Sequence, residues 1–428
     1  MPQTTLVQAV IKKGKVKGSV TVPASKSMLQ RYMIAALIAP DETELHSANH
    51  CSDTVACLKA VQVLGATVIH DKGGLLRIKG NGSKIEPISN EINCGESGFA
   101  LRVMSAVASL SGSEIHMTGN GSLMKRPVGF MMDVFRQLGV KCTSSNGQLP
   151  ITVQGPVKFK DIITDGSISS QFLSGLLMIF PLADKDHIIE VHSLKSRLYI
   201  DLTLEVLSNF GIEIRNENYN RFIIPGGQQY KGCLVSVEGD WSSASCMFVA
   251  GAVAGEVTVK NLSLKSNQPD KIILHVLKEA GAEILIRENE ITVRRPVEKM
   301  LSPFYFDASD CPDLFPALAA LASQCNGISE IAGVDRLVHK ESNRALALQQ
   351  EFSKLRTNMI SIEGNTMKIE GGKLKGTEVH SHHDHRIAMA LAIAGLNAEG
   401  ETIIADSDAV KKSYPEFFND LSRIITYE

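Results

Sequence analysis

The sequence lacks a strong charge of either sign and a long hydrophobic run. Its formal net charge is −2 over 428 residues, so overall charge favours neither nucleic acid nor an anionic membrane as a partner. The longest apolar runs, such as residues 172–183, fall short of the roughly 18 residues that a membrane span needs. Residues 1–10 lack a basic region followed by an apolar core, and we therefore expect no signal peptide.

The cysteines lack any metal-binding pattern. The eight cysteines include no CxxC pair or other metal-ligand spacing, and most fall inside apolar runs, as Cys246 and Cys325 do. We therefore expect reduced core thiols in a cytoplasmic protein, with no metal. With 44% apolar and 21% charged residues the chain should pack well, and its length suggests more than one domain.

What the sequence does contain is a sixfold repeat. Each copy opens with small or helix-capping residues and continues into an Ala/Leu-rich stretch, a strand-like run, an amphipathic stretch and more strand. The amphipathic stretches end near glycines 65, 139, 211 and 281, at intervals of 74, 72 and 70 residues, and a fifth ends at Arg356. The copies open near Ser25, Glu96, Ser169, Ser242, Asp310 and His383. So regular a period predicts one supersecondary unit built six times.

The copy over residues 97–155 shows the predicted order of elements. These are a buried helix (98–110), a strand (114–118), an amphipathic helix (127–138) and a hairpin (140–143 with 149–153). Gly139 suits the C-terminus of the second helix, and Asn146-Gly147 suits the hairpin turn. The unit is therefore β-α-β-α-β-β in circular order.

The two ends of the chain depart from the repeat. The sixth copy stops at Glu428, just after its second helix, with no room for closing strands. Residues 5–23, before the first copy, alternate like two strands around Gly14 and Gly18. The N-terminus can therefore supply what the last copy lacks.

These ends predict an α/β protein of two domains with three copies each. Residues 1–23 and 240–428 would form a discontinuous domain, and residues 24–239 a continuous one. The chain would cross between the domains near Pro23-Ala24 and near residues 237–240, and the two crossings together would make a natural hinge.

Basic residues accompany the openings of the copies. If the N-termini of the buried helices converge, their N–H groups and dipoles would make a site for phosphates and carboxylates. For any single helix, an ordinary Ser or Asp cap is the simpler interpretation. The basic residues favour the anion site, because Arg pairs readily with both groups. They are Lys26, Arg31, Arg126, Arg197, Lys340, Arg344, Arg386 and Lys412.

Two acids stand among these cations. Asp313 directly precedes an apolar helix, and Glu341 directly follows Lys340. A carboxylate among cations has a lowered pKa and can act as a base, whereas one in a desolvated cleft can hold and donate a proton. A helix cap remains the alternative role for Asp313.

Motifs in all six copies resemble those of a single family. They are Pro23-Ala24-Ser25-Lys26-Ser27 with Arg31, Ser97-Gly98 with Arg102, Arg126-Pro127, Ser169-Ser170-Gln171-Phe172-Leu173, Ser196 with Tyr199-Ile200-Asp201, Glu238-Gly239-Asp240 with Ser242-Ser243-Ala244-Ser245, Pro312-Asp313, Lys340-Glu341-Ser342 with Arg344, Asp384-His385-Arg386-Ile387-Ala388-Met389, and Lys412-Ser413-Tyr414-Pro415. In this order they resemble the enolpyruvylshikimate-phosphate synthase family, which includes the target of the herbicide glyphosate.

The resemblance implies a two-domain inside-out α/β barrel fold of six βαβαββ repeats, with the active site in a cleft that closes over substrate. It implies transfer of the enolpyruvyl group of phosphoenolpyruvate to the 5-hydroxyl of shikimate 3-phosphate, through a tetrahedral intermediate and with release of phosphate. It further implies a monomer in the shikimate pathway, leading to chorismate and aromatic amino acids, that needs no metal or organic cofactor.

The resemblance also implies roles for particular residues. Asp313 would accept the hydroxyl proton, Glu341 would donate to the methylene, and Lys26 would share in catalysis. The residues implied to bind shikimate 3-phosphate are Lys26, Ser27, Arg31, Ser169, Ser170, Gln171, Ser196, Tyr199, Asp313 and Lys340. Those implied to bind phosphoenolpyruvate are Lys26, Gly98, Arg126, Gln171, Arg344, Asp384, Arg386 and Lys412.

Four positions depart from the family pattern. Glu96 and Phe99 stand where the second motif usually has Asn and Thr, and Arg336 stands where many members have Asn. Asn343 replaces the usual Asp after Lys340-Glu341-Ser342. A carboxylate at position 96 would repel phosphoenolpyruvate unless it turns away or pairs with an arginine.

Two other functions remain as alternatives. The sister enzyme, UDP-N-acetylglucosamine enolpyruvyl transferase, shares the fold and donor but has a Lys-Asn opening and typically a reactive Cys in the second copy. Here the opening is Lys26-Ser27, and residues 112–125 contain no Cys. A non-catalytic repeat scaffold would explain the repeats, but it does not explain charged residues at matching loop positions.

Overall fold

Each copy of the repeat contributes two helices, and the first is almost wholly buried. The computed structural model describes residues 7–427 except residues 289 and 298. The first helices are α1 (Lys26–Ile38), α3 (Gly98–Ala108), α5 (Ser170–Ile179), α7 (Trp241–Ala254), α9 (Phe315–Ala322) and α11 (His385–Gly395). Every residue of α3, α7, α9 and α11 is buried, as their Ala/Leu-rich sequences predict, and the buried residues include the charged Arg102 of α3 and Arg386 of α11.

The second helix of each copy covers this buried layer with one apolar face. These helices are α2 (Ser52–Val63), α4 (Phe130–Gln137), α6 (Leu198–Asn209), α8 (Ile273–Glu279), α10 (Arg344–Leu355) and α12 (Phe417–Ile424). In α12, Phe417, Leu421 and Ile424 are buried at helical spacing, while Ser422 and Arg423 are exposed. Helix α4 begins three residues later than predicted, with Gly129 at its N-cap, and a separate 3₁₀ helix covers residues 121–125.

Side-chain caps start five of the six first helices, as predicted. Ser25, Ser97 and Ser169 each accept a backbone N–H, as do Asp240 and Asp384. In the fourth copy the cap is Asp240 rather than the serines that follow it. Helix α9 has no side-chain cap and is entered through the 3₁₀ helix Pro312–Leu314.

Left-handed glycines end four of the second helices. Gly65, Gly139, Gly211 and Gly281 have φ of 111°, 67°, 78° and 90°. A side chain is strained in this conformation, so the helices end where the repeat places a glycine. The predicted stop signal is confirmed.

Residues 24–238 contain three four-stranded sheets of one design. Their orders are β14-β3-β5-β4, β6-β7-β9-β8 and β10-β11-β13-β12. In each, the first two strands are parallel and the remaining neighbours antiparallel. The bounds are β3 (Glu42–His46), β4 (Thr67–Lys72), β5 (Leu75–Lys79), β6 (Glu91–Asn93), β7 (Glu114–Thr118), β8 (Lys141–Ser145), β9 (Gln148–Gln154), β10 (Ile162–Asp165), β11 (His187–His192), β12 (Arg215–Glu217), β13 (Arg221–Ile224) and β14 (Leu234–Ser236).

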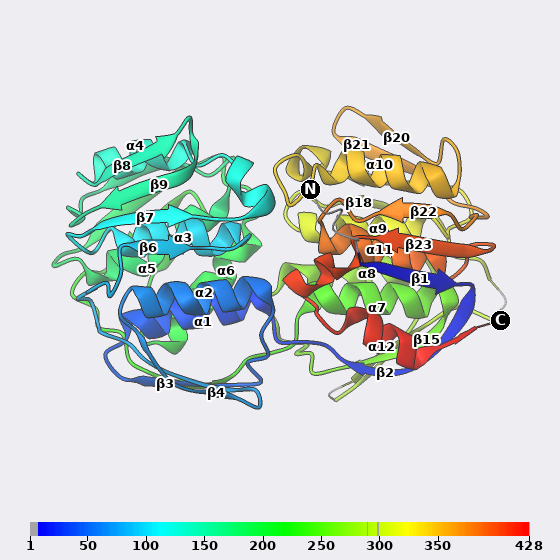
Figure 1. Cartoon of the computed structure of the whole chain (residues 1–428), viewed down its shortest axis with the longest axis horizontal. Helices are drawn as coiled ribbons and strands as arrows, with labels where there is room; N and C mark the ends of the chain where they lie inside the picture. The colour runs from blue at the N-terminus through cyan, green and yellow to red at the C-terminus, as the bar shows by residue number, and fades with distance from the viewer. Residues whose placement is uncertain (1–6, 289, 298, 428) are drawn as a thin grey trace, which may run out of the picture. The chain divides into compact units, whose positions relative to one another are not determined.

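The rest of the described chain holds three further sheets. Their orders are β16-β17-β15-β2-β24, β18-β19-β21-β20 and β1-β23-β22 (Figure 1). The bounds are β1 (Gln8–Lys12), β2 (Gly14–Thr21), β15 (Gly255–Lys260), β16 (Glu283–Arg287), β17 (Glu290–Arg294), β18 (Tyr305–Asp307), β19 (Ile328–Ala332), β20 (Ile360–Glu363), β21 (Thr366–Glu370), β22 (Glu378–His380), β23 (Glu401–Ala405) and β24 (Ile425–Tyr427).

The ends of the chain pair differently from the prediction. Strand β1 does complete the last copy by pairing with β23, but β2 enters the sheet of the fourth copy beside β15. The C-terminus also forms a strand, β24, which the sequence did not predict and which pairs with β2. Gly14 and Gly18 lie within β2: added Cβ atoms would meet Thr426 O at 2.8 Å and Ile424 Cγ2 at 2.6 Å. They permit close approach rather than a turn.

The chain divides into two compact units. One comprises Met1–Pro23 with Gly239–Glu428, and the other Ala24–Glu238. Each unit has its own apolar core, centred on its three buried helices. The segments that connect the units are hydrogen-bonded to each other: Asp240 N donates to Pro23 O and Ser25 N to Glu238 O.

Candidate functional site

Seven predicted residues of the discontinuous unit form one ionic network, which we call the Asp313 cluster. Its members are Asp313, Lys340, Glu341, Arg344, Asp384, Arg386 and Lys412. Asp313 lies in the 3₁₀ helix before α9. Its carboxylate accepts from Lys340 at 3.2 Å, from Arg344 at 2.9 Å and from Arg386 at 3.1 Å. Asp313 therefore binds three cations and is not the cap of α9.

Arg344 is the centre of this cluster. It is the first residue of α10, and its side chain is only 1% exposed. Besides Asp313, it contacts Glu341 at 2.6 Å and Asp384 at 2.8 Å. A guanidinium with three carboxylate partners is held in one orientation by its planar fork of donors.

Asp384 supports the cluster from behind. It is fully buried, caps α11 by accepting from Arg386 N at 3.0 Å, and accepts from Ser342 Oγ at 3.1 Å. Both of its oxygens also face Arg344. Asp384 therefore orients the side chain of Arg344, and its predicted contact with phosphoenolpyruvate stays a prediction.

The cations of the cluster outnumber its acids. Four basic side chains face three carboxylates, and the last of them, Lys412, lies 3.9 Å from Glu341. Burial alone would raise the pKa of Asp313, but the charges of Arg386, Lys340 and Arg344 hold it well below its usual range. Asp313 is therefore ionised at neutral pH and can accept a proton.

Burial and charge act in opposite directions on the cations. Burial lowers the pKa of Lys340, and the charge of Asp313 offsets only part of that effect. Burial also opposes the charged form of Arg344, yet Asp384, Glu341 and Asp313 raise its pKa well above the usual value. Arg344 is thus a permanent cation at this site.

In the continuous unit, Lys26 is paired rather than exposed to solvent. Its Nζ lies 3.0 Å from Asp53 Oδ2, and both side chains are largely buried. The second oxygen of Asp53 is buried without a partner among the described residues. Gln30 donates to the backbone oxygen of Asp53 and to Ser97 Oγ. These two hydrogen bonds join α1 to the starts of α2 and α3.

Arg31 is buried in the same helix without a carboxylate partner among the described residues. It donates to Thr203 Oγ1 at 2.9 Å, to Ser27 O at 2.8 Å and to Tyr199 O at 3.0 Å. Burial lowers the pKa of Arg31 to about 9, and it stays protonated at neutral pH. The structure thus brings together Ser27, Arg31 and Tyr199, three of the predicted acceptor-binding residues.

Two arginines meet over Gly98 at the start of α3. A Cβ atom on Gly98 would lie 2.9 Å from Arg126 Nη1, 3.0 Å from Arg102 Nη1 and 3.6 Å from Gln171 Oε1. Gln171 accepts from Arg102 at 2.7 Å. A side chain at position 98 would displace these guanidinium groups, which lie close to the helix N-terminus, a favourable place for an anion.

The three predicted serines lie beside α5 and α6. Ser169 caps α5 by accepting from Gln171 N, and Ser170 is the first residue of that helix. Ser196 directly precedes the cap of α6 with a positive φ of 53°. Their role near an acceptor phosphate stays a prediction.

Sequence reasoning missed two charged residues of the continuous unit. Asp53, the partner of Lys26, lies in a segment with no motif, so no sequence signal could have found it. Arg102 belongs to the second motif, but the resemblance gives it no binding role. Its contact with Gln171 and its approach to Gly98 put it beside two of the predicted phosphoenolpyruvate-binding residues.

The unusual residues have structural roles. Asn343 caps α10 by accepting from Leu346 N, so it retains the capping function of an Asp. Glu96 directs its carboxylate against Gly121, where an added Cβ would lie 2.6 Å from its oxygen. Phe99 stacks under Arg31, with 4.3 Å between the guanidinium carbon and the ring centroid.

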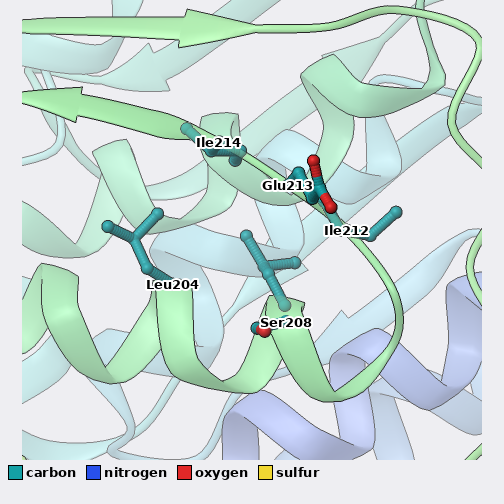
Figure 2. A pocket seen from close by; sticks show the side chains of 6 residues that line it. Leu204, Ser208, Ile212, Glu213 and Ile214 are labelled. Carbon is teal, nitrogen blue, oxygen red and sulfur yellow. The ribbon is translucent and has the colours of Figure 1, made fainter.

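Other features of the described chain add no competing site. The eight cysteines form no disulfide, and within residues 7–427, leaving out 289 and 298, no group of His, Cys, Asp and Glu is arranged to hold a metal ion. No described helix is long and apolar enough to cross a membrane. A hollow of about 220 Å³ at the end of α6, lined by Leu204, Ser208 and Ile212 among others, contains none of the predicted site residues (Figure 2).

Comparison with known proteins gives a full-length match. The family model described as EPSP synthase (3-phosphoshikimate 1-carboxyvinyltransferase) matches residues 10–421. A Clostridium botulinum protein of that enzyme name is 39% identical over 418 residues, covering 96% of each chain. A Methanosarcina mazei protein of the same name is 39% identical over 427 residues, covering 98% of each.

Solved structures show the same fold. EPSP synthase from Acinetobacter baumannii matches with a TM-score of 0.82 and 26% identity, over 98% of this chain and 99% of that one. The enolpyruvyl transferase NikO from Streptomyces tendae, at 16% identity and a TM-score of 0.76, is similar in fold alone. These matches confirm the predicted inside-out α/β fold and the family resemblance.

Proposed function

The chain belongs to the EPSP synthase family, and on that basis we propose that it transfers the enolpyruvyl group of phosphoenolpyruvate to the 5-hydroxyl of shikimate 3-phosphate. The products are 5-enolpyruvylshikimate 3-phosphate and phosphate, in the shikimate pathway to aromatic amino acids. The observation that carries the proposal is the Asp313 cluster, in which seven residues from four separate motifs form one network.

The donor, phosphoenolpyruvate, needs cations for a phosphate and a carboxylate. We assign it to Lys26, Gly98, Arg126 and Gln171 in the continuous unit and to Arg344, Asp384, Arg386 and Lys412 in the other. In support, Gly98 stands against two guanidinium groups, and the Asp313 cluster has more cations than acids. Arg102 joins this set on the same geometry.

The acceptor, shikimate 3-phosphate, also carries a phosphate and a carboxylate. We assign it to Lys26, Ser27, Arg31, Ser169, Ser170, Gln171, Ser196 and Tyr199, with Asp313 and Lys340 near its hydroxyl groups. Arg31 supports the assignment because it is a buried cation that makes no ion pair within the described residues. An anionic ligand would complete its coordination.

The addition step requires a base and an acid. Asp313 accepts the proton of the 5-hydroxyl, because its three cations keep it ionised. Glu341 donates a proton to the methylene carbon after an anionic group of the substrate has displaced the Glu341 carboxylate from Arg344. Once it no longer pairs with Arg344, the carboxyl group of Glu341 holds a proton more readily.

The elimination step expels phosphate from the tetrahedral intermediate. A base removes a proton from the new methyl group, and we assign this to Glu341, which the addition step leaves ionised, while protonated Asp313 returns its proton to the departing phosphate. Lys26 stabilises the charge that develops on the departing phosphate. Every proton and charge is thus handled by side chains of this chain.

We further propose that the protein works as a monomer in the cytoplasm. Eight unpaired cysteines, six of them buried, are typical of a reducing compartment. Sedimentation of the purified protein at micromolar concentration should give a single species of 46.4 kDa, and a stable dimer would contradict the monomer.

The function is tested by following inorganic phosphate with purified protein and both substrates. Phosphate should appear only when phosphoenolpyruvate and shikimate 3-phosphate are both present. Equal release with UDP-N-acetylglucosamine as acceptor would instead indicate the sister reaction. Absence of release with both proposed substrates would exclude the function.

A further inference from the structure

The ring of Phe99 packs against one face of the guanidinium group of Arg31. Phe99 lies in the first turn of α3 and Arg31 in α1, and the guanidinium carbon is 4.3 Å from the ring centroid. The two side chains are 8% and 1% exposed. The contact is therefore desolvated, which is the setting in which a cation–π interaction is strongest.

Arg31 has few other means of holding its charge. Its three hydrogen-bond acceptors, on Thr203, Ser27 and Tyr199, are all neutral oxygens. Within the described residues no carboxylate pairs with it. A buried cation without a counter-charge is costly, so the negative face of an aromatic ring matters here more than at a solvated arginine.

The hydrogen bonds and the ring constrain different motions. The three bonds lie in the plane of the guanidinium group, since its donors are coplanar. The ring covers a face of that plane. Together they fix both the direction and the tilt of the donors that remain for a ligand.

We propose that Phe99 is a positioning residue for the acceptor substrate, acting through Arg31. The inference rests on the proposed function, in which Arg31 binds an anionic group of shikimate 3-phosphate. Loss of the ring then weakens acceptor binding and leaves the donor and the chemical step unchanged. A residue that only fills the core would show no such selectivity.

The first test compares Phe99→Leu with Phe99→Tyr in steady-state kinetics. Phe99→Leu keeps an apolar side chain but removes the aromatic face, and should raise KM for shikimate 3-phosphate roughly tenfold. KM for phosphoenolpyruvate and kcat should stay within about twofold, and Phe99→Tyr should restore KM. Equal losses for both substrates, or no recovery with tyrosine, would overturn the proposal.

The second test separates ring charge from ring shape. Replacement of Phe99 by 3,4,5-trifluorophenylalanine preserves its packing but withdraws charge from the ring face, and should raise the same KM several-fold. The control is the same replacement at Phe135, a buried ring that packs edge-on against Phe172. An unchanged KM at position 99, or equal effects at both positions, would make Phe99 a packing residue only.

These outcomes are distinct from failure of the proposed function. If the unmodified protein releases no phosphate, the function is wrong whatever Phe99 does. If the unmodified protein turns over normally and the Phe99 variants have the same KM for shikimate 3-phosphate, the proposed function is supported and the positioning role of Phe99 is wrong.

Discussion

At the scale of the residue, the site consists of buried charges whose partners decide their chemistry. The motifs predicted the cations and both acids, because each stands beside a helix start or an apolar run. They could not predict the pairing of Lys26 with Asp53, since the two are brought together only by the packing of α1 on α2. When a residue lies in no motif and its partner is distant in sequence, only the three-dimensional structure shows that the two pair.

Lys26→Met separates structure from catalysis. The substitution leaves the largely buried carboxylate of Asp53 without its partner, which should lower the free energy of unfolding by about 2 kcal/mol. Turnover should be abolished while the protein remains folded. Chemical denaturation and phosphate release measure the two effects.

The double variant Lys26→Met/Asp53→Asn is the matched control. It removes the unpaired buried charge, so stability should recover while turnover stays absent. Recovered turnover in the double variant, or near-normal activity in the single one, would contradict the catalytic role of Lys26.

Asp313→Asn should uncouple binding from turnover. It removes one negative charge from a cluster that already has more cations than acids, so phosphoenolpyruvate should bind at least as tightly by calorimetry. It also removes the proposed base, and kcat should fall by roughly 10²–10⁴-fold. The exposed Asp335→Asn serves as control and should change neither quantity.

At the scale of the element, the repeat predicts helices better than strand partners. Glycine stop signals and serine caps are local, and the structure confirms them. Strand β2 pairs with β15 and β24, which lie hundreds of residues away in the sequence. The sequence therefore suggested that the two glycines of β2 mark turns, whereas in the structure they allow close contact with the C-terminal segment.

The turn before α11 should respond to pH. His380 Nδ1 accepts a hydrogen bond from His382 N at 2.8 Å, and a protonated Nδ1 cannot accept it. Burial is the largest effect that lowers the pKa of His380 below 6.5, and the charges of His382 and His383 lower it further. The charges of Asp406 and Glu351 act in the opposite direction.

The sign of this effect follows from the lowered pKa. The unfolded chain binds the proton more tightly, so the contribution of His380 to stability is complete above pH 6.5 and is lost as pH falls. His380→Asn, whose side-chain oxygen can also accept, should reduce the loss of stability as the pH falls below 6.5. His275→Asn, on the exposed face of α8, should not. Identical pH profiles for His380→Asn and the unmodified protein would refute this account of the turn.

At the scale of the whole molecule, the two units differ in how the chain completes them. The fragment 24–238 contains all strands of its three sheets, whereas residues 239–428 lack β1 and β2. Because β2 lies between β15 and β24, its loss opens the sheet in the middle. Unfolding of the two fragments should therefore differ.

Circular dichroism and thermal unfolding measure this difference. The fragment 24–238 should fold cooperatively and bind shikimate 3-phosphate, yet release no phosphate because it lacks the Asp313 cluster. Residues 239–428 should fold only when residues 1–23 are supplied, either as a peptide or linked after residue 428. Independent folding of residues 239–428 would show that β1 and β2 are dispensable.

The proposed enolpyruvyl transfer cleaves the carbon–oxygen bond between the enolpyruvyl group and the phosphate of phosphoenolpyruvate. It is tested most directly with phosphoenolpyruvate carrying ¹⁸O at the bridging position, followed by mass spectrometry of the phosphate and the product. Addition and elimination predict that the released phosphate keeps the label and that the product's ether oxygen comes unlabelled from the shikimate 5-hydroxyl. Unlabelled phosphate, with no enolpyruvyl product, would mean simple phosphate-ester hydrolysis and would contradict the account.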